Sequence, residues 1–308
     1  MYCKETVVYL PEILLEAERC IQESLLLEVG TTPKPGLVDK KDNGAHKDMS
    51  YITFVQSTYA VTPYLLQMMW EGYRHEQEVK MFFPVIREIG KRAERAMYRK
   101  TNGVNTHKGA IFTLGILCGA AGYCYRKYQK MDAGMILDIS KEMCASYMQK
   151  DFLGMKRKNP STSGEYLYLV YGEKGIRGQA EKGFPIIREI SYPLMKQYQR
   201  QNRESNAANI NVLLMIMQHL NDTNILSRSG YDYGTLHQVQ EVSGAILEVG
   251  GAFCPRGTKC VERLNEICIQ KNISPGGSAD ILAATLLLCS LENLGGNMSW
   301  KSRRRRKI

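Results

Sequence analysis

The sequence predicts an all-α protein, a single large helical, bundle-like domain with long functional loops. Apolar residues recur at helical spacing in one segment after another, and nowhere do strands alternate with helices. Neither GxGxxG nor GxxxxGK[ST] occurs, so the usual nucleotide cradles of α/β proteins are absent. A hydrophobic fraction of 44% and a charged fraction of 23% over 308 residues are typical of a soluble globular protein.

Helical spacing first appears from Pro11 to Val29, where the apolar residues share one face. Asp48 is expected to cap the second helix, which runs toward Trp70, and Ser274 to cap the last one. The helices expected between these are Val79 to Arg99, Gly109 to Tyr125, Met131 to Met148, Ile186 to Gln199, Ala207 to Leu220, Tyr233 to Val249 and Gly257 to Lys271. The segment from Asn159 to Pro185 has five glycines and two prolines, so we expect a short hairpin or a long loop there.

The distribution of charge predicts a boundary after residue 295. Residues 1–295 form the expected helical domain, and residues 296–308 a basic, disordered tail. The net charge is +10, of which five charges lie in the run from Arg303 to Lys307, and a body charge of +5 suits polyanionic small molecules. Aromatic residues do not alternate with basic ones, which disfavours nucleic acid as the partner.

Cysteine usage and hydropathy indicate a cytoplasmic protein. The nine cysteines are scattered and form no CxxC pair, so we expect them to be reduced. The first twenty residues acquire acidic charge too early for a signal peptide. The longest uncharged run, from Gly109 to Tyr125, has seventeen residues, whereas a membrane span needs about 20, so we expect no membrane segment.

The polar loop TNGVNTHKG before the helix at Gly109 concentrates the chemistry of this sequence. It places Asn105, Thr106, His107 and Lys108 beside a helix start, where unpaired backbone amides can bind an anion. The loop is therefore either a phosphate cradle or a well-capped entry to a buried helix. A second glycine-rich helix start, SPGGSAD, repeats this design near the end of the chain and carries Asp280 one turn in.

Three further segments carry polar residues on irregular backbone. The loop TTPKPGLVDKKDNGAHKDM exposes Lys34, Asp39, His46 and Asp48, and such loops often hold catalytic groups. Asp222 begins a compact polar cluster that we place at a helix C-terminus. A glycine-flanked arginine, Arg177, lies in GIRGQ and could approach a phosphate closely; alternatively each segment is a solvated surface loop.

Taken together, these stretches resemble the triphosphoribosyl-dephospho-CoA synthase family. The resemblance rests on TPKPGLVD, NGAHKDM, GVNTHKGAIF, GIRGQAEKGFP, DTNILSRSG and SPGGSADILA, in this order from about Glu28 to Leu288. One departure is Gln179, where the family tends to have glutamate. The resemblance implies an all-helical enzyme that joins ATP to 3'-dephospho-CoA, releases adenine, and makes the precursor of the prosthetic group of citrate lyase or, in related systems, of malonate decarboxylase. An acyl-carrier-protein transferase would then take the product.

Within that resemblance, each candidate residue receives an expected role. The residues expected to bind substrate are Lys34, Asn105, Thr106, Lys108, Arg177, Gly276, Gly277 and Ser278. A Mg²⁺ ion would share the triphosphate charge and prefers oxygen ligands, which Asp39, Asp48, Asp222 and Asp280 could supply. The expected proton-transfer groups are His46, His107 and Asp39.

Three other readings remain open from the sequence. The chain could be a non-catalytic nucleotide or CoA carrier, an enzyme of the same chemistry with another acceptor nucleotide, or an RNA-binding protein acting through its arginine run. The sequence does not separate the citrate lyase pathway from the malonate decarboxylase pathway, and it does not give the oligomeric state.

Overall fold

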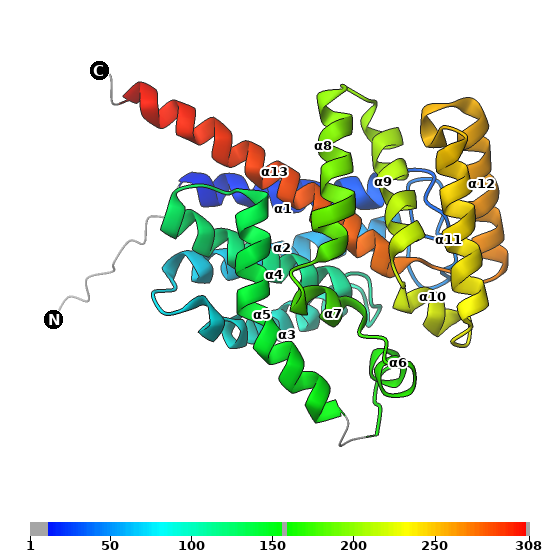
Figure 1. The fold of residues 1–308 in the computed structure, drawn as a ribbon, viewed down its shortest axis with the longest axis horizontal. Coiled ribbons are helices and arrows are strands. Elements are labelled where there is room, and N and C mark those ends of the chain that lie inside the picture. Colours follow the sequence, from blue (N-terminus) through cyan, green and yellow to red (C-terminus); the bar gives the residue numbers. More distant parts are fainter. Residues whose placement is uncertain (1–11, 156–158, 306–308) are drawn as a thin grey trace.

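A computed structural model describes residues 12–155 and 159–305 of the chain, with side chains placed up to residue 294. Every regular element in these residues is a helix, which confirms the predicted fold class (Figure 1). The α-helices are α1 (Glu12–Gly30), α2 (Tyr51–Arg74), α3 (Phe83–Lys100), α4 (Lys108–Tyr128), α5 (Ala133–Met155), α6 (Ser163–Tyr171), α7 (Gly175–Glu181), α8 (Tyr192–Arg200), α9 (Ser205–His219), α10 (Thr223–Arg228), α11 (Tyr233–Glu248), α12 (Pro255–Gln270) and α13 (Gly276–Arg305). Short 3-10 helices at Val79–Met81 and Gly251–Phe253 and a π-helical turn at Ile187–Ser191 complete the set.

Helix α4 is buried along most of its length, as its apolar sequence predicts, and packs closely on α2. Glycines permit this approach, because a Cβ atom added to Gly72 would lie 2.1 Å from the carbonyl oxygen of Gly119. A Cβ atom on Gly122 would likewise lie 1.9 Å from the carbonyl oxygen of Met69. The position of α4, and of the loop before it, is therefore fixed by backbone contact with α2.

Helix α2 begins two residues later than the sequence analysis predicted. Its N-cap is Ser50, whose hydroxyl accepts a hydrogen bond from the Thr53 amide, and Thr53 bonds back to the Ser50 amide in a capping box. The prediction that Asp48 caps this helix is wrong, because the chain is still irregular there and the Asp48 side chain is 62% exposed.

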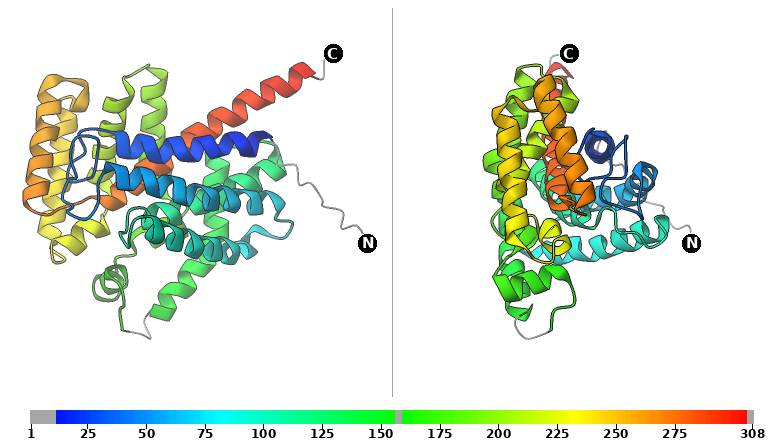
Figure 2. Two further views of the ribbon diagram at one scale, coloured as in Figure 1. Left: turned by 180° about the vertical axis from the view of Figure 1, so that it is seen from behind. Right: turned by 90° about the vertical axis from the view of Figure 1, so that its right-hand side faces the viewer.

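The first and last helices of the described chain lie side by side (Figures 1 and 2). Within α13, the segment Gly276–Leu294 is long and apolar enough to cross a membrane by those criteria alone, but 67% of it is buried inside the protein. It packs against α1, α4 and α9 and so serves as a core helix. The helix continues to Arg305, beyond the boundary predicted at residue 295, and residues 306–308 lie outside the described part.

The predicted hairpin or long loop between Asn159 and Pro185 is instead largely helical, so this prediction is wrong. Helix α6 is capped by Thr162, whose hydroxyl accepts from the Glu165 amide, and it ends at Gly172, whose φ of 73° suits glycine. Helix α7 starts three residues later, at Gly175. The glycines separate two short helices, and they do not prevent helix formation.

Candidate active site

The start of α4, the start of α13 and the end of α1 meet around a cavity of about 130 Å³. Every polar segment singled out in the sequence except the one around Arg177 contributes to its lining. The polar lining residues are Glu28, Lys34, His46, Asn105, Thr106, His107, Lys108, Asn224, Arg228, Ser274 and Asp280. This convergence of segments from both ends of the chain makes the cavity the candidate active site.

The side chain of Asp280, from α13, lies against the first turn of α4. Its carboxylate accepts a hydrogen bond from the Ala110 amide, and it lies so close to Gly109 that an added Cβ atom would meet its Oδ2 at 1.9 Å. Burial raises the pKa of Asp280 well above its usual range, and the neighbouring charges of Glu28 and Asp222 raise it further. The helix start predicted as an anion site thus already holds a carboxylate of this chain.

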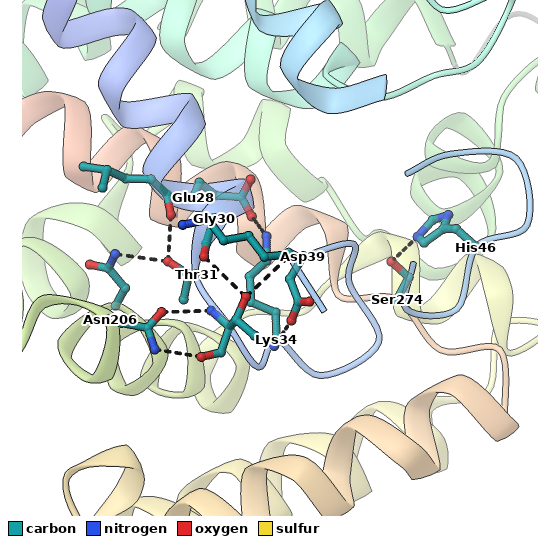
Figure 3. A network of polar contacts seen from close by, with 12 residues as sticks. Glu28, Gly30, Thr31, Lys34, Asp39, His46, Asn206 and Ser274 are labelled. Carbon is teal, nitrogen blue, oxygen red and sulfur yellow. Dashed lines mark hydrogen bonds and ion pairs between the residues drawn. The ribbon is translucent and has the colours of Figure 1, made fainter. Parts of the chain in front are cut away.

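Glu28 and Lys34 form a buried ion pair next to Asp280 (Figure 3). The two residues are only 4% and 1% exposed. Burial raises the pKa of Glu28, and the adjacent Lys34 ammonium opposes that rise. The sequence analysis missed Glu28. Its signal was present, since Glu28 lies three residues after Leu25 and seven after Ile21, on the apolar face of α1.

Asp39 shapes the loop that carries Lys34 and does not line the cavity. One carboxylate oxygen accepts from the Lys34 amide at 3.0 Å, and the other accepts from the amides of Lys41 at 2.6 Å and Asp42 at 3.1 Å. Asn206 on α9 holds the beginning of the same loop through two hydrogen bonds with the backbone of Thr32 (Figure 3). Asp39 therefore has the contacts of a structural residue.

His107 is buried and is held by two hydroxyl side chains. The Thr106 hydroxyl donates to the Ser57 hydroxyl at 2.7 Å, and Ser57 lies 2.7 Å from His107 Nδ1. The Ser57 proton then has Nδ1 as its acceptor, which leaves the proton of the neutral ring on Nε2. Burial, helped by the positive charge of Lys34, lowers the pKa of His107 to about 3. Nε2 has no hydrogen-bond partner within the described residues, so His107 offers a neutral N–H donor.

His46 lies across the cavity, in the loop before α2. Its Nε2 is 2.9 Å from the Ser274 hydroxyl, and its Nδ1 is 3.5 Å from Arg228 Nη1 (Figure 3 shows the serine contact). Burial lowers the pKa of His46, the Arg228 charge lowers it further, and Asp48, 3.9 Å away, opposes them. Asp48 itself points to solvent at the rim. Arg228 also donates to the Ala45 carbonyl and, at 2.9 Å, to the Asn272 carbonyl, which ties this loop to the chain that precedes α13.

Asp222 caps the N-termini of two helices, α10 and α13. The sequence analysis had placed it at the C-terminus of a helix. As the N-cap of α10 it accepts from the Asn224 amide at 2.9 Å. At the start of α13 it accepts from the Gly277 amide at 3.3 Å, and from the amide and hydroxyl of Ser278 at 2.7 and 2.9 Å. Burial raises the pKa of Asp222, and these hydrogen bonds oppose the rise. The amides of the second glycine-rich helix start are thus occupied by this carboxylate.

Replacing Asp222 with alanine should therefore destabilise the protein by about 2–4 kcal/mol, because two caps are lost and each is worth about 1–2 kcal/mol. Asp222→Asn can still accept hydrogen bonds and should lose less. The control is Asp232→Ala, which removes the exposed single cap of α11. Urea unfolding followed by circular dichroism measures all three. An Asp222→Ala loss no larger than that of Asp232→Ala would contradict the double-cap role.

Three predicted substrate-binding residues lie at or beyond the rim. Lys108 is exposed and forms an ion pair of 3.4 Å with Glu94 on α3, and Asn105 accepts from the Lys108 amide at 3.2 Å. Arg177 on α7 lines a different, larger cavity. Gln179, at the position that departs from the family pattern, accepts a hydrogen bond from the Ile186 amide at 3.2 Å, which explains its fit in this fold.

The residues gathered here, buried carboxylates with a lysine and two neutral histidines, are those of an enzyme, and comparison gives the class as a transferase. The chain belongs to the family described as ATP:dephospho-CoA triphosphoribosyl transferase, whose family model matches residues 15–299. It is 38% identical over 273 residues to a Vibrio cholerae protein named probable 2-(5''-triphosphoribosyl)-3'-dephosphocoenzyme-A synthase, covering 88% of this chain and 86% of that one.

Two further relatives agree with this family. The synthase of Escherichia fergusonii is 36% identical over 270 residues, covering 87% of this chain and 88% of the relative. Protein CitXG of Leuconostoc mesenteroides is 36% identical over 275 residues, covering 87% of this chain and 57% of that longer protein. No solved structure matches the chain.

Proposed function

We propose that this chain transfers the 5-triphosphoribosyl group of ATP to the 2'-hydroxyl of 3'-dephospho-CoA in the small cavity, with release of adenine. The observation that supports this site is the convergence of two carboxylates, buried Glu28 and partly buried Asp280, with the buried Lys34 in the lining of one cavity. Breaking the bond between ribose and adenine leaves an oxocarbenium-like ribose, and nearby negative charge stabilises such a cation.

The proton balance assigns roles to two residues. The C1'–adenine bond breaks, a bond from C1' to the 2'-oxygen forms, and the proton that the hydroxyl loses balances the one that adenine gains. Asp280, whose carboxylate lines the cavity, is the group suited to accept the hydroxyl proton. His107 is neutral, and in the tautomer in which Ser57 donates to Nδ1 its Nε2–H is suited to donate a hydrogen bond to the departing adenine.

The donor set of the cavity fits a Mg²⁺ ion. Within the part of the chain that the structure describes, Asp280 receives one backbone hydrogen bond and Glu28 is engaged only by Lys34, so both carboxylates keep oxygen lone pairs for a hard cation. The carboxylate oxygens of Asp39 and Asp222 accept hydrogen bonds from backbone amides, and Asp48 is exposed. We therefore propose Glu28 and Asp280 as the metal-binding pair. When bound, the ion would share the charge of the triphosphate.

The cellular setting is part of the same proposal. The chain acts in the cytoplasm, and an acyl-carrier-protein transferase takes its product to build the prosthetic group of citrate lyase. The relative named Protein CitXG supports the citrate lyase pathway. Growth of a deletion strain on citrate or on malonate as sole carbon source would separate this pathway from malonate decarboxylation.

The proposed role of His107 predicts a graded response to substitution. His107→Leu removes the donor and should lower kcat about 100-fold, the usual cost of one lost transition-state hydrogen bond. His107→Gln places an amide N–H near the position of Nε2 and should stay within about tenfold of wild type. Because the His107 pKa is about 3, its protonation should produce no change in wild-type kcat between pH 5 and 8. A Gln variant as slow as the Leu variant would argue against the donor role.

The function itself is tested by incubating the purified protein with ATP, Mg²⁺ and 3'-dephospho-CoA. Free adenine is measured by chromatography and the CoA product by mass spectrometry. We expect equal amounts of adenine and of a triphosphoribosyl adduct. Adenine without the adduct would indicate hydrolysis or another acceptor, and binding of both ligands without adenine release would indicate a carrier.

A further inference from the structure

A second, larger cavity lies beside the candidate active site. Its volume is about 840 Å³, and its lining comes from α2, α3, α4, α5, α6, α7 and the chain just before α6. We propose that this cavity binds the diphosphate and pantetheine arm of 3'-dephospho-CoA, while the ribose of that acceptor reaches the small cavity. This inference rests on the proposed function and adds the location of the acceptor.

The volumes of the two cavities suit them to different parts of the substrates. Pockets that enclose small molecules usually have volumes of about 300–1,000 Å³. The small cavity, at about 130 Å³, has room for reacting groups but not for two nucleotides. The large cavity, at about 840 Å³, can hold an elongated cofactor-sized arm.

The chemistry of the large cavity matches such an arm. Its apolar floor consists of side chains from four helices, namely Met68, Phe83, Ile86, Ile111 and Leu169. Two cationic side chains, Lys150 and Arg177, line the same cavity; Arg177 donates a hydrogen bond to Met155 Sδ at 3.8 Å and lies near the carboxylate of Glu165, which also lines the cavity. Neither cation forms an ion pair within the described residues, while Arg87 pairs with Asp151. Unpaired cations over an apolar floor suit a diphosphate followed by an uncharged chain.

The two cavities adjoin at the first turn of α4. Lys108 lines the small cavity and Glu94 the large one, and their ion pair of 3.4 Å spans the boundary. Residues up to Ala110 line the small cavity, and Ile111 lines the large one. An acceptor molecule lying across this boundary would place its ribose near Asp280 and its arm over α3.

Filling the large cavity tests the proposal. Gly90 on α3 lines it, and an added Cβ atom would meet only Met68, at 3.7 Å, so a larger side chain can extend into the open space. Gly90→Phe should raise the KM for 3'-dephospho-CoA at least tenfold and leave the KM for ATP within about twofold. Calorimetry should show the same loss of dephospho-CoA affinity without turnover. The matched control is Gly164→Phe, on an exposed site outside the cavity with no atom within 4 Å of the added Cβ.

A charge variant keeps the test independent of the bulky substitution. Arg177→Ala should weaken dephospho-CoA binding about tenfold, whereas Arg188→Ala, which removes a half-exposed arginine paired with Asp138, should not. Unchanged dephospho-CoA affinity in both Gly90→Phe and Arg177→Ala would overturn the proposal, and so would a rise in the KM for ATP alone. These outcomes differ from failure of the proposed function, in which the wild-type protein itself releases no adenine.

Discussion

Replacing Asp280 with asparagine is expected to lower kcat for adenine release by about 100-fold to 1,000-fold and, at the same time, to stabilise the protein. Activity falls because the charge that faces the reacting ribose and the proton acceptor are both removed. Stability rises because Asp280 is partly buried beside the charges of Glu28 and Asp222, and asparagine keeps the oxygen that accepts from Ala110 without the charge. An activity loss caused by unfolding would come with lost stability, so the opposite signs exclude that cause.

The pH dependence of unfolding provides the measurement. A carboxyl group whose pKa is raised by folding stabilises the native state below its unfolded pKa, about 3.9 for aspartate, and this contribution is lost as the pH rises through the raised value. In EDTA, the wild-type unfolding free energy should therefore fall more steeply with pH above 4 than that of Asp280→Asn. At pH 8 the variant should be the more stable protein. The control is Asp232→Asn on the exposed cap of α11, which should alter neither activity nor the pH slope above about pH 5, where an aspartate with a lowered pKa is already ionised in both states. A less stable Asp280→Asn at pH 8 would contradict this account of the site.

Replacing Lys34 with methionine is expected to cost about 3–5 kcal/mol of stability, because it leaves Glu28 as a buried charge without its partner. Activity should be lost as well. The double variant Lys34→Met with Glu28→Gln should recover much of the stability, since neither charge then remains, and yet stay inactive. Denaturant unfolding of the wild type, both single variants and the double variant gives the coupling energy of the pair.

The surface counterpart of this pair is the control. Lys108→Met breaks the ion pair between half-exposed Lys108 and Glu94. It should lower the free energy of unfolding by less than about 1 kcal/mol. If Lys34→Met cost no more than Lys108→Met, the Glu28 carboxyl would have to be protonated and uncharged in the native state.

The fold class and the cavity-forming segments could be predicted from the sequence because both leave local signals. Helical periodicity marks α1 and α4, and polar residues beside glycines mark the starts of α4 and α13. Contacts between residues far apart in the sequence leave no such local pattern. The pairing of Asp222 with the α13 amides, which assigns a capping role to a residue predicted to bind metal, depends on tertiary contact. The helices α6 and α7 were missed because they are short and glycines lie both between them and within α7, so that composition alone resembles a loop.

The pairing of α1 with α13 has a consequence for how the protein is made. Glu28 emerges early from the ribosome and Asp280 among the last residues of the core, so the candidate active site is not complete until synthesis is almost finished. Until then the apolar face of α1 that α13 will cover is open to solvent and to other chains. A chain that ends before α13 would lack one wall of the candidate active site, and the apolar face of α1 would stay exposed. We expect such a chain to be bound by chaperones or degraded, and to be inactive.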